Sequence, residues 1–185
     1  MQIKGGDLLI APAAMRDTRF FKSVILLTHH HVGGSYGLCL NRPTSYTVQD
    51  LIDEAEMDLE CQLSMPLYWG GPVQPNTVWM LHDPEWSTRY TVPVNNNWSM
   101  TSHTEMFYHL ADNDWPKWFR VFHGYAGWGP GQLQMELTSQ GAWEHHSSWL
   151  TVSQVEPESV LEQDESQLWT TTVELSAKQA MDHWL

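Results

Sequence analysis

The sequence has few basic residues. Nine Lys and Arg residues stand against 22 Asp and Glu residues, which gives a formal net charge of −13. A surface with this charge repels phosphate backbones and anionic lipid head groups at long range. We therefore do not expect direct binding to nucleic acid.

Cysteines and long apolar runs are also scarce. Two cysteines, Cys39 and Cys61, are too few for a disulfide framework, and Cys39 is predicted to be a small buried hydrophobe. No apolar run approaches the roughly 20 residues that a membrane-spanning helix needs. The segment 1–7 lacks the pattern of a signal peptide. We expect a cytosolic protein with no membrane association.

No internal repeat and no low-complexity linker divides the chain. Its 185 residues fit one domain, residues 1–185, large enough to bury a core without a metal or a disulfide. Eleven tryptophans are too many to hide completely in a domain of this size. Exposed tryptophans favour self-association or a protein partner.

Apolar patterning predicts strands and helices that alternate irregularly, which is typical of an α+β fold with a mixed, curved sheet. The expected strands are 8–11, 23–28, 36–40, 67–69, 78–81, 119–123 and 148–152. Helices are expected after two capping boxes, Thr47 with Asp50 and Ser102 with Glu105. Further helices are expected at 132–138 and at 164–184, the latter broken near Ser176.

A glycine-rich segment, 124–131, is expected to form a loop before the helix that begins at Gln132, and it has two interpretations. The preferred one is structural, because glycine permits tight turns and close packing around Trp128. In the alternative, backbone N–H groups near Gly129 and Gly131 hold the anion of a small metabolite in an enzyme. The base would then be His82 or His123.

Two other motifs also have a structural and a functional interpretation. Gly70-Gly71-Pro72 is preferred as a bulge and strand exit over a pocket wall beside His82. The run 29–31 is all histidine, but only His29 and His31 share a face of a strand, and two ligands do not make a specific metal site. His145-His146 could add ligands, but no cysteine or carboxylate spacing confirms a site, so we assign neither metal nor cofactor. No G-x-S-x-G elbow is present, and the catalytic residues stay unknown.

Three blocks of residues, taken together, resemble the YqgE/AlgH family over about residues 7–143. The blocks are Leu9-Ile10-Ala11-Pro12 with Asn41-Arg42-Pro43, Gly70-Gly71-Pro72-Val73 with Leu81-His82, and Gly124-Tyr125-Ala126-Gly127-Trp128 with Gly131-Gln132-Leu133. The resemblance implies a bacterial protein with a bifurcated sheet, folded into a pseudo-barrel and flanked by helices. It implies no activity. The family is sometimes labelled as a transcriptional regulator, but this label does not rest on a recognised DNA-binding element.

We therefore expect a non-enzymatic binding or regulatory module, with the enzyme described above as the alternative. We predict a candidate ligand groove made of selected polar, aromatic and glycine residues from the three blocks. Its members are Asn41, Arg42, Gly70, Gly71, His82, Tyr125, Trp128, Gly131 and Gln132.

Overall fold

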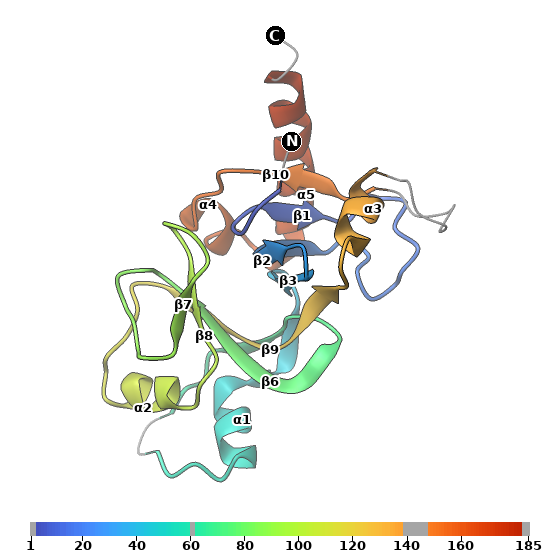
Figure 1. The fold of residues 1–185 in the computed structure, drawn as a ribbon. Helices are drawn as coiled ribbons and strands as arrows, with labels where there is room; N and C mark the ends of the chain where they lie inside the picture. The colour runs from blue at the N-terminus through green and yellow to red at the C-terminus, as the bar shows by residue number, and fades with distance from the viewer. Residues whose placement is uncertain (1–2, 60–61, 139–147, 183–185) are drawn as a thin grey trace.

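The computed structural model describes residues 3–59, 62–138 and 148–182, and in them a strongly curled sheet is flanked by helices (Figure 1). The strands are β1 Leu8–Ile10, β2 Val24–His31, β3 Gly34–Cys39, β4 Pro43–Thr47, β5 Pro66–Trp69, β6 Val73–His82, β7 Thr91–Pro93, β8 Ser99–Thr101, β9 Phe119–Trp128 and β10 Leu150–Val152. The helices are α1 Val48–Glu54, α2 Glu105–Ala111, α3 Gln132–Thr138, α4 Glu158–Leu161 and α5 Glu165–Asp182.

Strand β9 is the branch point of the sheet. The main path runs β10-β1-β2-β3-β9-β6-β8-β7, and β5 leaves it from β9 and pairs with β4. The first half of β9 pairs with β5 in parallel, at Leu67 and Val121, while the second half pairs with β3, at Gly37 and Ala126. The α+β class and the bifurcated, curled sheet are thus confirmed. β9 and β6 bend sharply in Figure 1, as this branching requires.

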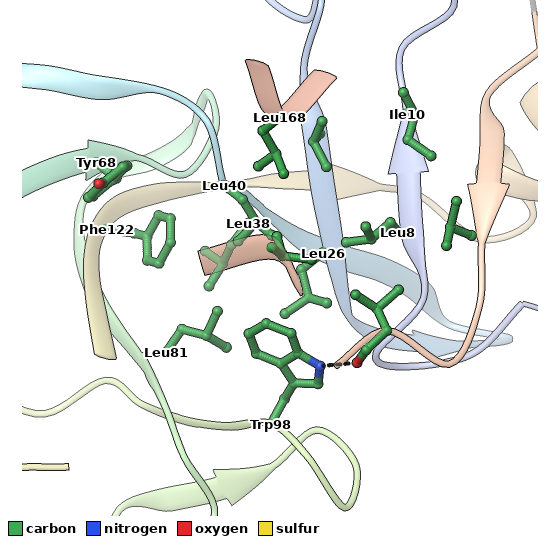
Figure 2. Close-up of a cluster of buried hydrophobic side chains, with 14 residues drawn as sticks. Leu8, Ile10, Leu26, Leu38, Leu40, Tyr68, Leu81, Trp98, Phe122 and Leu168 are labelled. Carbon is green, nitrogen blue, oxygen red and sulfur yellow. Dashed lines mark hydrogen bonds between the residues drawn. The ribbon is translucent and has the colours of Figure 1, made fainter. Parts of the chain in front are cut away.

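The curl has an apolar cluster on its inside, which we call the central cluster. Leu26, Leu38, Leu81 and Phe122 meet there from four strands, with Trp98 beside them (Figure 2). Two other clusters lie on the opposite side of the strands, one under α3 and one under α1 and α2. β1 and the first five residues of β2 are therefore buried on both faces.

The glycine-rich segment does not form the expected loop, because β9 continues through it to Trp128. Neighbouring strands provide the ladder bonds, through the pairs Tyr36 with Gly127 and Val73 with Tyr125. Gly124 has φ +64°, and the resulting irregularity turns Tyr125 to the same side as Phe122. A local pattern of glycines could not reveal these distant partners.

The two capping boxes had different outcomes. At α1 the Thr47 backbone N–H donates to the Asp50 carboxylate at 2.7 Å and the Thr47 hydroxyl accepts from the Asp50 N–H at 3.2 Å, which confirms the prediction. The second prediction is wrong, because α2 begins only at Glu105 and its Thr104 cap has no side-chain hydrogen bond. The Glu105 N–H donates to a ring nitrogen of His103, at 3.1 Å, so an imidazole takes the place of the expected hydroxyl.

Helix α5 is continuous, contrary to the break expected near Ser176. The Ser176 hydroxyl donates to the Thr151 carbonyl at 3.0 Å and so ties the helix to β10 instead of interrupting it. Trp169 adds a second tie, from its indole N–H to the Ala11 carbonyl at 2.7 Å. No helix among the described residues is both long and apolar enough to cross a bilayer.

Most of the described tryptophans lie in the interior or at its border. Among the described residues, Trp115 is the one tryptophan in the exposed class, with 47% of its surface accessible. The expectation of some exposure is confirmed at this position, while Trp143 and Trp184 lie outside the described residues. Cys39 is buried as predicted, and burial raises the pKa of its thiol. Cys61 lies outside the described residues.

Tyr68 should make the stability of the protein depend on alkaline pH. Its buried hydroxyl donates to Glu165 at 2.5 Å, and burial, followed by this hydrogen bond, raises the pKa of Tyr68 to about 12. The folded state then holds a proton that the unfolded state loses near pH 10, so the free energy of unfolding falls as pH rises from about 10 to 12. Denaturant unfolding at several pH values checks this. Tyr68→Phe should lessen the decline, and an unchanged decline would contradict the assignment.

Candidate functional site

Asn41 and Arg42 form a corner that holds the entrance of β2. The Asn41 amide accepts from the Val24 N–H and donates to the Lys22 carbonyl, both at 2.9 Å. Arg42 donates to the Phe21 carbonyl and to the Ser23 hydroxyl, the latter at 3.3 Å. The Asn41 amide is thus engaged within the chain, whereas the buried Arg42 Nε has no partner among the described residues. A ligand role for the corner stays a prediction.

Gly70 and Gly71 lie against the backbone of β9. The Gly70 N–H donates to the His123 carbonyl at 2.9 Å, and a Cβ at this position would lie 2.4 Å from the Gly124 oxygen. At Gly71 a Cβ would lie 2.1 Å from the Tyr125 carbonyl carbon. Glycine therefore allows two backbones to approach here, which supports the structural interpretation.

His82 lies in the interior and not on an open wall. Its ring nitrogens contact the Asp83 carbonyl at 2.7 Å and the Thr101 hydroxyl at 3.0 Å, and none of its surface is accessible. Burial lowers the pKa of His82, so the ring is neutral near pH 7. Both nitrogens are occupied, and the ring serves to link β6 to β8.

Trp128 and Gln132 are linked through Glu136 at the beginning of α3, next to Gly131. Glu136 accepts from the indole N–H of buried Trp128 at 3.0 Å and from the Gln132 amide at 2.9 Å. The side-chain oxygen Oε1 of Gln132 in turn accepts from the Gly129 N–H at 3.0 Å. One N–H of the expected anion site is thus already bound, and α3 has only seven residues to add a dipole.

The three histidines of β2 divide between the two sides of the strand. His29 and His31 lie on the same side with ring centroids 4.4 Å apart, as the strand period predicted, while the His30 ring contacts the Ser35 hydroxyl at 2.7 Å. His145 and His146 lie outside the described residues. Within the described ranges, no group of three or more His, Cys, Asp or Glu side chains is placed to hold a metal ion.

A pocket of about 370 Å³ opens beside the central cluster, and it contains only Tyr125 of the predicted set. Its walls continue the inner faces of the core strands. Tyr36 lies two residues before Leu38 on β3, and Trp79 lies two residues before Leu81 on β6, so each ring is on the same side of its strand as the core leucine. We call it the aromatic pocket. Its lining consists of Thr28, His29, Tyr36, Leu38, Gln74, Trp79, Tyr90, Val92, Pro93, Met100, Ser102 and Tyr125.

The chemistry of the aromatic pocket is apolar and uncharged. No Lys, Arg, Asp, Glu or Cys occurs among the described residues that line it. The Thr28 hydroxyl is engaged by the Tyr36 carbonyl at 3.1 Å. Burial, followed by repulsion from His31 and His30, lowers the pKa of His29, which leaves its ring neutral near pH 7. The indole N–H of Trp79 is buried and has no partner in the described part of the chain.

Sequence reasoning missed this pocket because its walls come from six strands and from single residues before β7 and after β8. Period-two alternation was the available signal, since Tyr36 and Trp79 occupy the positions of core leucines displaced by two residues. The topology of the sheet decides which ends of these strands face β7 across the curl. The sequence of a single strand does not contain this information.

Comparison with known proteins gives one family. A model of the AlgH-like family matches residues 8–180. A UPF0301 protein from Vibrio atlanticus is 33% identical over 173 residues, which cover 90% of this chain and 88% of the relative. Another UPF0301 protein, from Cupriavidus metallidurans, is 36% identical over 156 residues, covering 83% of this chain and 78% of the relative.

Two solved structures share the fold. The solution structure of the AlgH protein from Pseudomonas aeruginosa matches with a TM-score of 0.77 at 24% identity, over 95% of this chain and 92% of that one. The crystal structure of protein DIP2367 from Corynebacterium diphtheriae matches with a TM-score of 0.70 at 21% identity, over 93% and 86% of the two chains. At these identities the likeness concerns the fold alone.

Proposed function

This chain belongs to the AlgH-like family, and on that premise we propose that it is a non-enzymatic module that binds a small molecule with an apolar body in the aromatic pocket. The observation that carries the proposal is the lining, in which Tyr36, Trp79 and Tyr125 surround an uncharged cavity. A volume of about 370 Å³ falls in the range of small-molecule sites, which are concave and mostly apolar.

The enzyme alternative, with an anionic metabolite at Gly129–Gly131, has less support. Gln132 already binds the Gly129 N–H, and His82 is enclosed by its own partners. His29 lines the aromatic pocket, but none of the described lining residues is an Asp or Glu that could orient its ring as a base. The geometry therefore favours binding over catalysis.

We also propose a cytosolic location and a regulatory role that works through the bound molecule. A buried free thiol at Cys39 fits a reducing compartment. The net charge of −13 makes direct contact with DNA unfavourable. Regulation through the bound molecule would then act on a partner protein or on a second copy of the chain. Trp115 is an exposed aromatic side chain that such a partner could contact.

A fluorescent apolar probe tests the proposed function. The uncharged dye N-phenyl-1-naphthylamine, which becomes bright in apolar surroundings, should bind the protein saturably and at one site. Val92→Asp should weaken binding by about tenfold, because it places a charge on the pocket rim that the dye must desolvate.

Val32→Asp is the matched control, since Val32 lies in the β2–β3 turn, outside the pocket lining, with 95% of its surface exposed. This variant should bind the dye as the unchanged protein does. Equal losses in the two variants, or dye binding that does not saturate, would contradict a specific pocket.

A further inference from the structure

The Tyr125 ring of the aromatic pocket stands nearly at right angles to two other rings that line it. The Tyr125 ring meets the Tyr36 ring at an interplanar angle of 84°, with centroids 5.3 Å apart. It meets the Trp79 ring at 90°, with centroids 6.1 Å apart. The three belong to different strands, β9, β3 and β6, so the sheet itself sets their arrangement.

Rings arranged as walls around a cavity suit a particular kind of ligand. The face of an aromatic ring carries partial negative charge, and a cation within about 6 Å of its centre is attracted to it. An alkylated ammonium ion also has an apolar surface and gives up water easily, so it can enter an uncharged cavity. Recognition of quaternary ammonium groups by several such rings is the common functional use of this interaction.

No unpaired positive charge among the described lining residues opposes a cation. No Lys or Arg lines it among the described residues. Arg89 lies near the rim, with its guanidinium 4.8 Å from the centre of the Tyr90 ring, but it pairs with Glu105 at 3.3 Å. His103 stacks on Tyr90 with centroids 3.7 Å apart. The net charge of −13 attracts cations to the molecule as a whole.

We propose that the aromatic pocket receives a quaternary ammonium group carried by a small molecule. This inference rests on the proposed function, because it specifies the chemistry of the molecule that the pocket binds. Tyr36, Trp79 and Tyr125 supply the ring faces, and Leu38 and Met100 supply apolar contact for the alkyl groups.

The decisive comparison uses two molecules of the same shape, only one of which is charged. Choline and its carbon isostere 3,3-dimethyl-1-butanol differ in a nitrogen that carries the positive charge. In calorimetric or NMR titrations at low salt, choline should bind at least about tenfold more tightly than the isostere. Hydrophobic burial alone would give the isostere equal or tighter binding.

Each outcome affects the two proposals differently. If the isostere binds as tightly as choline, the quaternary ammonium inference fails and the proposed function stands. If N-phenyl-1-naphthylamine binds the pocket and choline does not, the inference again fails alone. If none of the three molecules binds, the proposed function fails and the inference fails with it.

Two sets of variants show whether the rings and the local charge are responsible. Tyr36→Leu should remove most of the preference for choline over the isostere, whereas Tyr46→Leu, at an exposed tyrosine of β4, should keep it. Val92→Lys should weaken choline more than the isostere, and Val92→Asp should weaken only the isostere. A preference that survives both Tyr36→Leu and Val92→Lys would overturn the assignment.

Discussion

Gly71→Ala is expected to destabilise the protein by at least about 3 kcal/mol, because strain and overlap add at one position. Gly71 has φ +154°, and a Cβ there would lie 2.1 to 2.3 Å from three backbone atoms of Tyr125 and Ala126. Backbone in the middle of β9 cannot move aside as a flexible side chain could. Either β5 and β6 separate from β9 or the variant does not fold.

Gly131→Ala is the control that separates the two causes. Gly131 also has a left-handed backbone, φ +71°, but a Cβ there would meet nothing within 4 Å. It should cost only about 1 kcal/mol, the conformational penalty of a non-glycine residue. Denaturant unfolding of both variants measures the difference. Similar losses would contradict the close approach of the two backbones.

The second large effect is expected at Arg120, whose side chain is only 10% exposed. It donates to the Leu40 carbonyl at 2.8 Å and to the Leu161 carbonyl at 2.9 Å, and it lies 3.5 Å from Glu165. Arg120→Met keeps the apolar stem but leaves these acceptors without their donor. We expect a loss of about 3–5 kcal/mol in the free energy of unfolding.

Arg89→Met provides the comparison, because Arg89 also pairs with a glutamate but is 72% exposed. Solvent screens such a pair, and its removal should cost less than about 1 kcal/mol. Denaturant unfolding of Arg120→Met should also become less cooperative if α4 and α5 detach first. A cost at Arg120 no larger than that at Arg89 would show that Arg120 does not hold these helices to the sheet.

Local signals in the sequence predicted much of the fold. The apolar run that became β2 and the capping box of Thr47 depend on neighbours in the chain, and both were recognised. The box at Ser102 was not formed, because His103 reaches the Glu105 N–H and Arg89 binds the Glu105 carboxylate. The same four-residue pattern therefore had two outcomes, and tertiary contacts decided between them.

The candidate site was harder to predict than the fold. The glycine-containing motifs at Gly70, Gly71 and Gly131 were assigned to the candidate groove. In the structure, Gly70 and Gly71 instead allow two backbones to approach each other at β9. The pocket contains Tyr125, which was predicted as a groove residue, but its other two large rings, Tyr36 and Trp79, look like ordinary strand residues in the sequence. Their meeting depends on the curl of the sheet and on the irregularity at Gly124, neither of which a single strand specifies.

The indole N–H resonance of Trp79 reports most directly on the central claim, that the aromatic pocket is the ligand site. In ¹⁵N-labelled protein titrated with choline and, separately, with 3,3-dimethyl-1-butanol, this resonance should shift saturably with at least one of them. The Trp115 indole N–H, which donates to the Leu110 carbonyl at 2.9 Å away from the pocket, should stay unchanged. A Trp79 signal that stays fixed while other resonances respond would contradict the claim.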